Sequence, residues 1–136
     1  MTLDEIVRWF ERLTRESVAD VGRYYAEDAF FKDPFNEVTG VEAVRRVFAH
    51  MFDQVEGPRF RVRERWQDAH GAMLTWTFEF RLRGESWTIR GATHLRFAAD
   101  GRITHHRDYW DAAEELYAKL PVLGAVMRAL QRRGRA

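Results

Sequence analysis

The sequence predicts one α+β domain: a curved antiparallel sheet that wraps around three N-terminal helices and is followed by a C-terminal helical tail. Two patterns and the composition predict this class. Apolar residues recur at helical spacing in the first half of the chain and alternate with polar residues in the second. Helices followed by antiparallel strands are typical of α+β domains. The 136 residues suit one domain, and 46% apolar with 14% aromatic content provides a sizeable core.

Three helical segments are expected before residue 57. Thr2 and Glu5 have the spacing of a capping box, in which each side chain satisfies a free amide at the helix start. A second segment starts near Ser17 and ends at Asp33-Pro34, because the residue before a proline avoids the α region. A third follows Gly40. Their apolar faces are Leu3, Ile6, Val7, Phe10 and Leu13; then Val18, Val21, Tyr24 and Tyr25; then Val41, Val44, Phe48, Met51, Phe52 and Val55.

Four antiparallel strands are expected between Gly57-Pro58 and residue 110, because strict alternation indicates a sheet with one buried face. Turns are predicted at His70-Gly71, Arg83 to Glu85 and Asp100-Gly101. From residue 112 the chain is expected to be helical, with an interruption at Pro121. This amphipathic tail could close the pocket mouth, pack on a partner subunit or touch an anionic surface, with packing as the default. The inner face holds Phe60 and Val62; then Leu74, Trp76, Phe78, Phe80 and Leu82; then Trp87, Ile89, Gly91, Thr93, Leu95 and Phe97.

The Asp100-Gly101 turn also predicts which residues face each other on the last two strands. A two-residue loop places Ala99 opposite Arg102, and opposed residues share a face of the sheet. Polar side chains of the last strand then enter a face that is otherwise apolar, which is typical of a ligand site. A one-residue bulge would reverse this assignment. The predicted pairs are Phe97 with Thr104, Leu95 with His106, Thr93 with Asp108, and Gly91 with Trp110.

Composition argues against several classes of protein. The 22 basic and 21 acidic residues give a net charge of +1, without the basic surface of a nucleic-acid-binding protein. No stretch reaches the roughly 18 apolar residues of a membrane span. The acidic, amphipathic start is unlike a secretory signal, so a cytoplasmic protein is expected. Cysteine is absent, and the five histidines lack zinc-site spacing, so neither a disulfide nor a metal site is expected.

One segment carries a family resemblance. The run from Tyr25 to Pro34, Tyr-Ala-Glu-Asp-Ala-Phe-Phe-Lys-Asp-Pro, followed by Gly40 opening a helix, resembles the ketosteroid isomerase-like group. That group belongs to the nuclear transport factor 2 superfamily, together with the SnoaL-type polyketide cyclases. The resemblance implies a cone of curved sheet and helices around a deep pocket, and a homodimer formed through the outer sheet face. It places a SnoaL-like domain at residues 1–111, with residues 112–136 as a helical extension of the same domain.

The resemblance also carries residues over. Asp33 stands where the isomerases have a proton-shuttling Asp, but Trp9 and Thr93 replace the Tyr and the protonated Asp that stabilise the enolate there. Steroid isomerase activity is therefore not carried over. Asp108 looks like the last-strand acid of the cyclase and epoxide-hydrolase branches, matched by place and not by motif.

The candidate catalytic residues are thus Asp33 and Asp108, which would move a proton, and His106, which would orient or relay it. Each has a structural alternative. Asp33 could terminate a turn, and His106 could be a satisfied core histidine. Asp108 could be a structural acid bonded to Thr93, to the indole N–H of Trp9 or in the neighbourhood of Arg107. The expected ligand-binding residues are Trp9, Tyr24, Phe52, Trp76, Phe78, Trp87, Thr93 and Trp110.

Two functions follow as hypotheses. The leading one is a cofactor-independent isomerase, cyclase, lyase or hydrolase that uses acid–base catalysis on a small apolar molecule bearing a carbonyl or similar group. The rival is a non-catalytic ligand-binding or dimeric scaffold protein, because one fold serves many functions. A nuclear-transport-type adaptor would rest on fold analogy alone.

Overall fold

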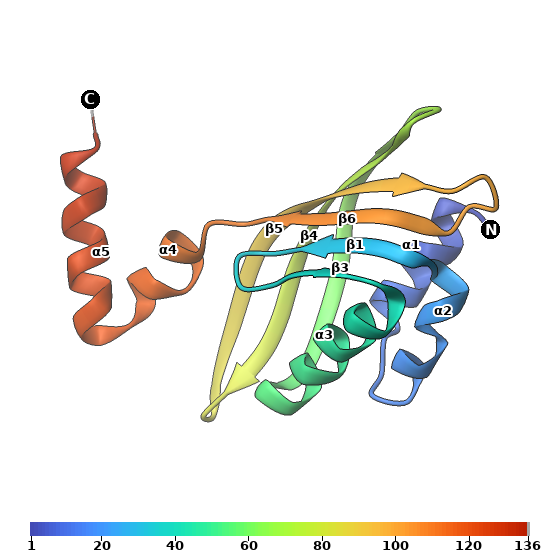
Figure 1. Ribbon diagram of the computed structural model, residues 1–136. Coiled ribbons are helices and arrows are strands. Elements are labelled where there is room, and N and C mark those ends of the chain that lie inside the picture. The colour runs from blue at the N-terminus through green and yellow to red at the C-terminus, as the bar shows by residue number, and fades with distance from the viewer. Residues whose placement is uncertain (136) are drawn as a thin grey trace.

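The computed structural model describes residues 1–135, and Figure 1 shows a curved sheet with helices against its concave face. The helices are α1 (Leu3–Glu11), α2 (Val21–Tyr24), α3 (Val41–Gln54), α4 (Ala112–Glu115) and α5 (Pro121–Arg133), with 3-10 turns η1 (Ser17–Asp20) and η2 (Tyr117–Lys119). The strands are β1 (Tyr25–Lys32), β2 (Glu37–Thr39), β3 (Glu56–Gln67), β4 (Gly71–Leu82), β5 (Glu85–Phe97) and β6 (Ile103–Tyr109). The α+β class and the curved sheet are confirmed.

The sheet has six strands in the order β2-β1-β6-β5-β4-β3, whereas four were predicted. The two additional strands come from residues that were assigned to the second helical segment and to the turn after it. Strand β1 pairs in parallel with β6, and an irregularity between Tyr25 and Phe30 disturbs its alternation of buried and exposed residues. The period-two signal of a strand is therefore missing from this stretch of sequence.

The hairpin between β5 and β6 has the predicted register over most of its length. Thr93 pairs with Asp108 and Leu95 with His106, as expected from the turn. The loop itself is one residue longer than predicted, because Ala98 is bonded to Arg102 across it. Gly101 takes a positive φ of 88° in this loop. A register shift between residues 96 and 97 compensates, so that Phe97 pairs with Ile103 instead of Thr104.

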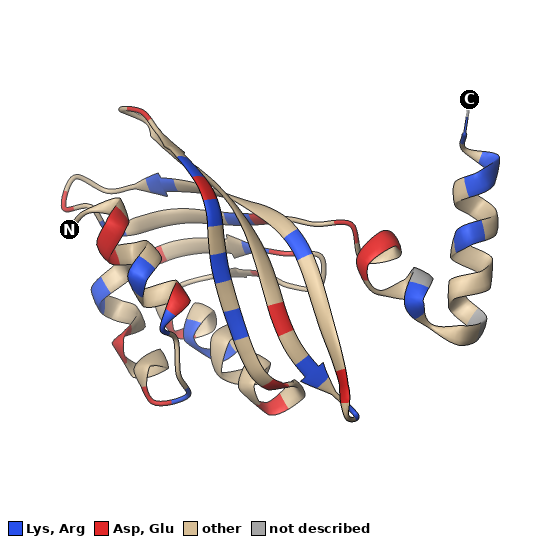
Figure 2. Cartoon of the chain, turned by 180° about the vertical axis from the view of Figure 1, so that it is seen from behind, with Lys and Arg blue, Asp and Glu red and all other residues tan. Residues whose placement is uncertain are grey.

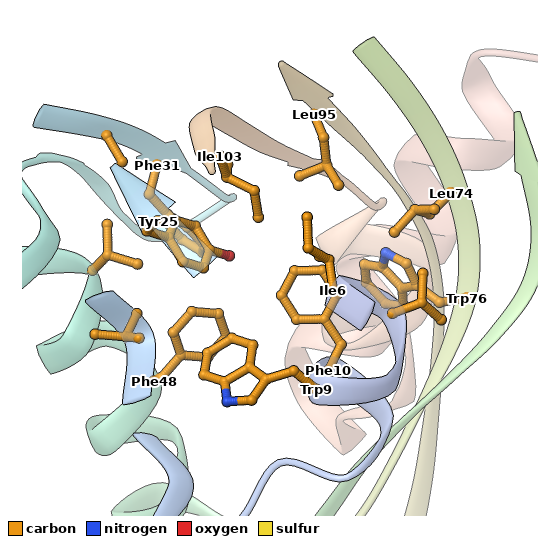
Figure 3. Packing of buried hydrophobic residues seen from close by; sticks show 14 of the residues in the cluster. Ile6, Trp9, Phe10, Tyr25, Phe31, Phe48, Leu74, Trp76, Leu95 and Ile103 are labelled. Atoms are coloured by element: carbon orange, nitrogen blue, oxygen red, sulfur yellow. The ribbon is translucent and has the colours of Figure 1, made fainter. Parts of the chain in front are cut away.

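The core lies between the concave face of the sheet and α1, α2 and α3 (Figure 3). The predicted capping box starts α1: the Thr2 amide donates to Glu5 Oε2 at 2.6 Å and the Glu5 amide donates to Thr2 Oγ1 at 3.3 Å. Burial of each large apolar side chain contributes roughly 1.5–3 kcal/mol. The largest side chains less than 2% exposed are Tyr25, Ile6, Leu74, Leu95, Ile103, Val7, Val21 and Val44.

Charged residues of both signs are spread along the strands of the sheet (Figure 2). Several arginines lie along β3, and acidic residues on neighbouring elements form ion pairs with some of them. For example, Arg61 Nε lies 3.1 Å from Glu79 Oε1 on β4. Opposite charges interleaved in this way do not form a continuous basic surface. Within residues 1–135, no helix has the length and apolar character needed to cross a membrane.

The C-terminal helices are anchored on β5 through one buried acid. Glu115 is 5% exposed, and its carboxylate lies 3.0 Å from Arg90 Nε and 3.6 Å from Lys119 Nζ. Beyond this anchor, α5 contacts mainly η2 and stands away from the sheet (Figure 1). Packing of α5 on a partner subunit therefore stays a prediction. Its side chains Leu123, Val126 and Leu130 are 40%, 50% and 56% exposed.

Candidate functional site

A cavity of about 30 Å³ lies between the helices and the concave face of the sheet. This volume accommodates only one or two water-sized groups. Apolar side chains form most of its wall, and three polar side chains from β5 and β6 form one corner. The lining residues are Phe10 from α1, Phe48 from α3, Phe60 and Val62 from β3, Leu74 and Trp76 from β4, Thr93 from β5, and His106 and Asp108 from β6.

The polar corner belongs to a chain of hydrogen bonds that crosses four strands. Trp76 Nε1 lies 2.7 Å from Thr93 Oγ1, which lies 2.5 Å from Asp108 Oδ1. The same carboxylate oxygen lies 2.7 Å from His106 Nε2, and His106 Nδ1 lies 2.7 Å from the Tyr25 hydroxyl. Figure 3 shows the Tyr25 hydroxyl directed into the interior. Two donors therefore hold one oxygen of Asp108.

The direction of each bond follows from the groups that take part. An indole N–H only donates, so Thr93 accepts from Trp76 and uses its single proton toward Asp108. Burial raises the pKa of Tyr25 well above its ordinary value, and the nearby Asp108 charge raises it further. Tyr25 therefore remains a phenol, which can donate to a bare ring nitrogen. Because a carboxylate only accepts, a neutral His106 has its proton on Nε2, directed at Asp108, and its Nδ1 accepts from Tyr25.

Every proton of this chain is thus already used. None of the donors on Trp76, Thr93, His106 and Tyr25 is left to stabilise a negative charge that develops on a ligand oxygen. The free position is the second oxygen of Asp108, since both hydrogen bonds to its carboxylate within residues 1–135 end on Oδ1. The corner can accept a proton or a hydrogen bond, but it cannot serve as an oxyanion hole.

The sequence from residue 6 to residue 106 matches the family model described as SnoaL-like domain. The chain belongs to the SnoaL-like domain family. No curated protein sequence matches it significantly.

Solved structures show the same fold at low sequence identity. A ketosteroid isomerase-like protein from Catenulispora acidiphila, in complex with trimethylamine, has a TM-score of 0.76 and 19% identity over 89% of this chain and 96% of its own. An M. tuberculosis epoxide hydrolase described as LEH-like has a TM-score of 0.72 and 18% identity over 95% of both chains. A nuclear transport factor 2-like protein of unknown function from Burkholderia pseudomallei has a TM-score of 0.71 and 19% identity over 84% and 95%.

Four predicted site residues of this SnoaL-like domain meet at the cavity: Trp76, Thr93, His106 and Asp108. The other predicted ligand-binding residues lie outside its lining. Trp9 donates its indole proton to the Ser17 carbonyl at 3.3 Å and stacks on Tyr24, which accounts for its burial without a ligand. The remaining four pack against other side chains: Phe52 against Arg15, Phe78 against Phe60, Trp87 against Phe80, and Trp110 against Phe35.

Asp33 also lies outside the cavity lining, contrary to the expectation that it sits at the pocket. Its Oδ1 accepts from the amides of Phe35 at 2.8 Å and Asn36 at 2.6 Å, and both carboxylate oxygens lie 3.1 Å from Asn36 Nδ2. The carboxylate thus closes the turn between β1 and β2, as Asp commonly does next to a proline. The turn alternative accounts for all of these contacts.

We expect Asp33→Ala to lower the free energy of unfolding by about 1 kcal/mol, since the amides that it satisfies lose their acceptor. Asp33→Asn keeps Oδ1 as an acceptor and should cost less than about 0.5 kcal/mol. Urea denaturation of the two variants measures both values. A larger loss for Asn than for Ala would contradict the turn assignment.

Tyr25 is the site residue that the sequence did not reveal. It was assigned to a helix face, whereas it lies on β1 and reaches His106 through a parallel pairing of strands about 80 residues apart in sequence. Tyr25 was named as the first residue of the family motif, but the motif does not indicate that its hydroxyl bonds to His106. Phe10, Phe48, Phe60, Val62 and Leu74 were predicted as apolar inner-face residues without a ligand role.

We expect Tyr25→Phe to lower the free energy of unfolding by about 1–3 kcal/mol, because His106 Nδ1 loses its donor in a buried place while the ring packing is kept. Tyr109→Phe is the matched control. Tyr109 is 48% exposed, and its variant should unfold like the parent chain. Chemical denaturation compares the two, and equal midpoints would contradict a buried Tyr25–His106 hydrogen bond.

Within residues 1–135, no three His, Asp or Glu side chains gather closely enough to hold a metal ion. Asp108 and His106 are the two that face the cavity together.

Proposed function

We propose that this SnoaL-like protein is a cofactor-independent acid–base enzyme that acts on a small, mainly apolar molecule, with Asp108 as the proton acceptor. The observation that carries the proposal is the position of this carboxylate. It lies at the polar corner of an otherwise apolar cavity, with one oxygen held by Thr93 and His106 and the other left for a ligand or a water. A fixed acceptor beside a bound reactant is what general base catalysis requires.

Hydrolysis is the reaction class that the hydrogen bonds favour. The corner offers an acceptor and no unused donor, which suits deprotonation of a water better than stabilisation of an enolate. With an epoxide, Asp108 takes a proton from water, and the water oxygen bonds to the ring carbon as the C–O bond breaks. The alkoxide then takes a proton from solvent, and Asp108 returns its own to solvent. One fold neighbour is an epoxide hydrolase, which supports this class.

A panel of small apolar epoxides and enolisable ketones tests the proposal. In H₂¹⁸O, epoxide opening yields a diol that carries one heavy oxygen; in D₂O, enolisation yields deuterium on carbon. The proposal expects the first product from the parent chain and from Asp33→Asn, and little from Asp108→Asn. Deuterium incorporation that survives Asp108→Asn would contradict the role of this residue.

A second candidate is non-catalytic binding of a small molecule, and the size of the cavity is the observation that favours it. About 30 Å³ admits only a small group unless the half-buried walls move. The Catenulispora acidiphila neighbour holds trimethylamine, a molecule of this kind. Saturable binding of a small ligand that is recovered unchanged, with no turnover anywhere in the panel, would favour this candidate.

We also propose that the protein forms a homodimer through the outer face of its sheet. Trp66 and Met73 pair across β3 and β4 and are 55% and 38% exposed. Exposed aromatic side chains of this kind are enriched at interfaces between subunits. Sedimentation should give about twice the chain mass of 16.1 kDa, and Trp66→Glu should give the single-chain mass. A monomeric parent chain would contradict this proposal.

A further inference from the structure

The cavity lining contains one carboxylate, Asp108, whose nearest nitrogen is His106 Nε2 at 2.7 Å. Asp108 is 15% exposed, and neither Lys nor Arg is among the residues that line the cavity. Its two hydrogen-bond donors, Thr93 and His106, are neutral groups in the arrangement described above. A carboxylate in apolar surroundings is costly unless it is paired, so a cation in the cavity would lower the free energy of the site.

The walls around this charge are aromatic. Phe10, Phe48, Phe60 and Trp76 line the cavity, and the rings of Phe60 and Trp76 meet edge to face at 5.6 Å and 90°. The face of an aromatic ring attracts a cation by roughly 0.5–2 kcal/mol, more when the site is dry. Aromatic walls that surround a single carboxylate attract an organic cation more strongly than a neutral molecule of the same shape.

The hydrogen bonds at the polar corner limit further the class of ligand that the cavity can bind. Because every donor at the corner is already used, a ligand has to bring its own proton to Asp108. An N–H of an ammonium group does so with a charge-assisted bond, which is about twice as strong as a neutral one. An alcohol brings a proton without the charge, and a carboxylate brings the wrong charge.

We propose that the cavity selects a small protonated alkylamine, with an N–H directed at Asp108 and its carbon atoms against the aromatic walls. The inference rests on the proposed function only in using Asp108 as the acceptor of the cavity. The volume of about 30 Å³ limits the part that enters to the ammonium head and one or two carbons.

A titration followed by nuclear magnetic resonance tests this with methylammonium chloride, methanol and sodium acetate as probes. The reporter is the indole N–H of Trp76, which is two hydrogen bonds from the ligand position, and its peak is assigned by its loss in Trp76→Phe. We expect a saturable shift with methylammonium and affinity about tenfold higher than for methanol. Acetate should cause no saturable shift.

Three variants locate the binding. Asp108→Asn keeps an oxygen that accepts from Thr93 and His106, so the fold should persist while affinity for methylammonium falls about tenfold or more. Asp28→Asn removes the same charge from an exposed position on β1 and should change nothing. Phe60→Leu should lower the affinity for methylammonium about threefold and change the affinity for methanol by less than about twofold.

Methanol binding as tightly as methylammonium, unchanged affinity in Asp108→Asn, or no saturable shift with any probe would each overturn the inference. These outcomes are separable from a failure of the proposed function. Loss of epoxide turnover in Asp108→Asn without methylammonium binding would leave the acid–base role standing and the ligand class wrong. Binding of methylammonium through Asp108, with no turnover in the panel, would leave the ligand class standing and the catalytic role wrong.

Discussion

Asp108→Asn should lower turnover about 10²- to 10⁴-fold, the usual contribution of a positioned general base. The amide cannot take a proton from water, but its oxygen can still accept from Thr93 at 2.5 Å and from His106 at 2.7 Å. The loss should therefore appear in kcat, with the fold and the substrate affinity largely kept. Steady-state kinetics on a panel member that the parent chain converts measures it.

Two further acids serve as controls for this result. Asp28→Asn changes the net charge equally at an exposed position, and Asp33→Asn keeps the acceptor that closes the turn between β1 and β2. Both should retain parent-like turnover. If Asp33→Asn lost as much activity as Asp108→Asn, the carboxylate of that turn would have a role that its present contacts do not account for.

Local sequence patterns predicted the elements that they encode directly. The capping box, the switch from helical to alternating spacing and the pairing of Thr93 with Asp108 are each set by residues close together in sequence or by a single turn. The loop at Gly101 was predicted one residue too short, yet the register shift after Arg96 restores the predicted pairs further along the strands. The hairpin register read from the sequence therefore predicted correctly that His106 and Asp108 point to the inner face of the sheet.

Long-range pairing accounts for what the sequence did not reveal. Strand β1 carries an irregularity that hides its alternation, and its partner β6 lies about 80 residues later. The contact of Tyr25 with His106 depends on that pairing, so the tautomer of the histidine could not be derived. Asp33 was misplaced for a different, local reason. Its motif match indicates the fold, but the direction of its side chain depends on the turn that it closes.

The close contact between Gly91 and Trp76 connects the packing of the sheet to the site. A Cβ built at Gly91 on β5 would lie 2.5 Å from the Trp76 ring, and that ring supplies the first donor of the hydrogen-bond chain. Alanine at a strand position also reduces the entropy of the unfolded chain, which stabilises by roughly 0.4–1 kcal/mol. The clash is the larger effect, because overpacking a core costs about 1–3 kcal/mol.

Gly91→Ala should therefore lower the free energy of unfolding, and Gly91→Val, with two more methyl groups against the same ring, should lower it further, by about 3 kcal/mol. Gly22→Ala on α2 is the matched control: nothing lies within 4 Å of its added Cβ, so helix propensity alone should raise stability by about 0.5–1 kcal/mol. Urea denaturation measures all three. Because Trp76 has to move, both Gly91 variants should also shift its indole N–H resonance and reduce turnover. A parent-like indole resonance in Gly91→Val would mean that the ring is not in contact with this glycine.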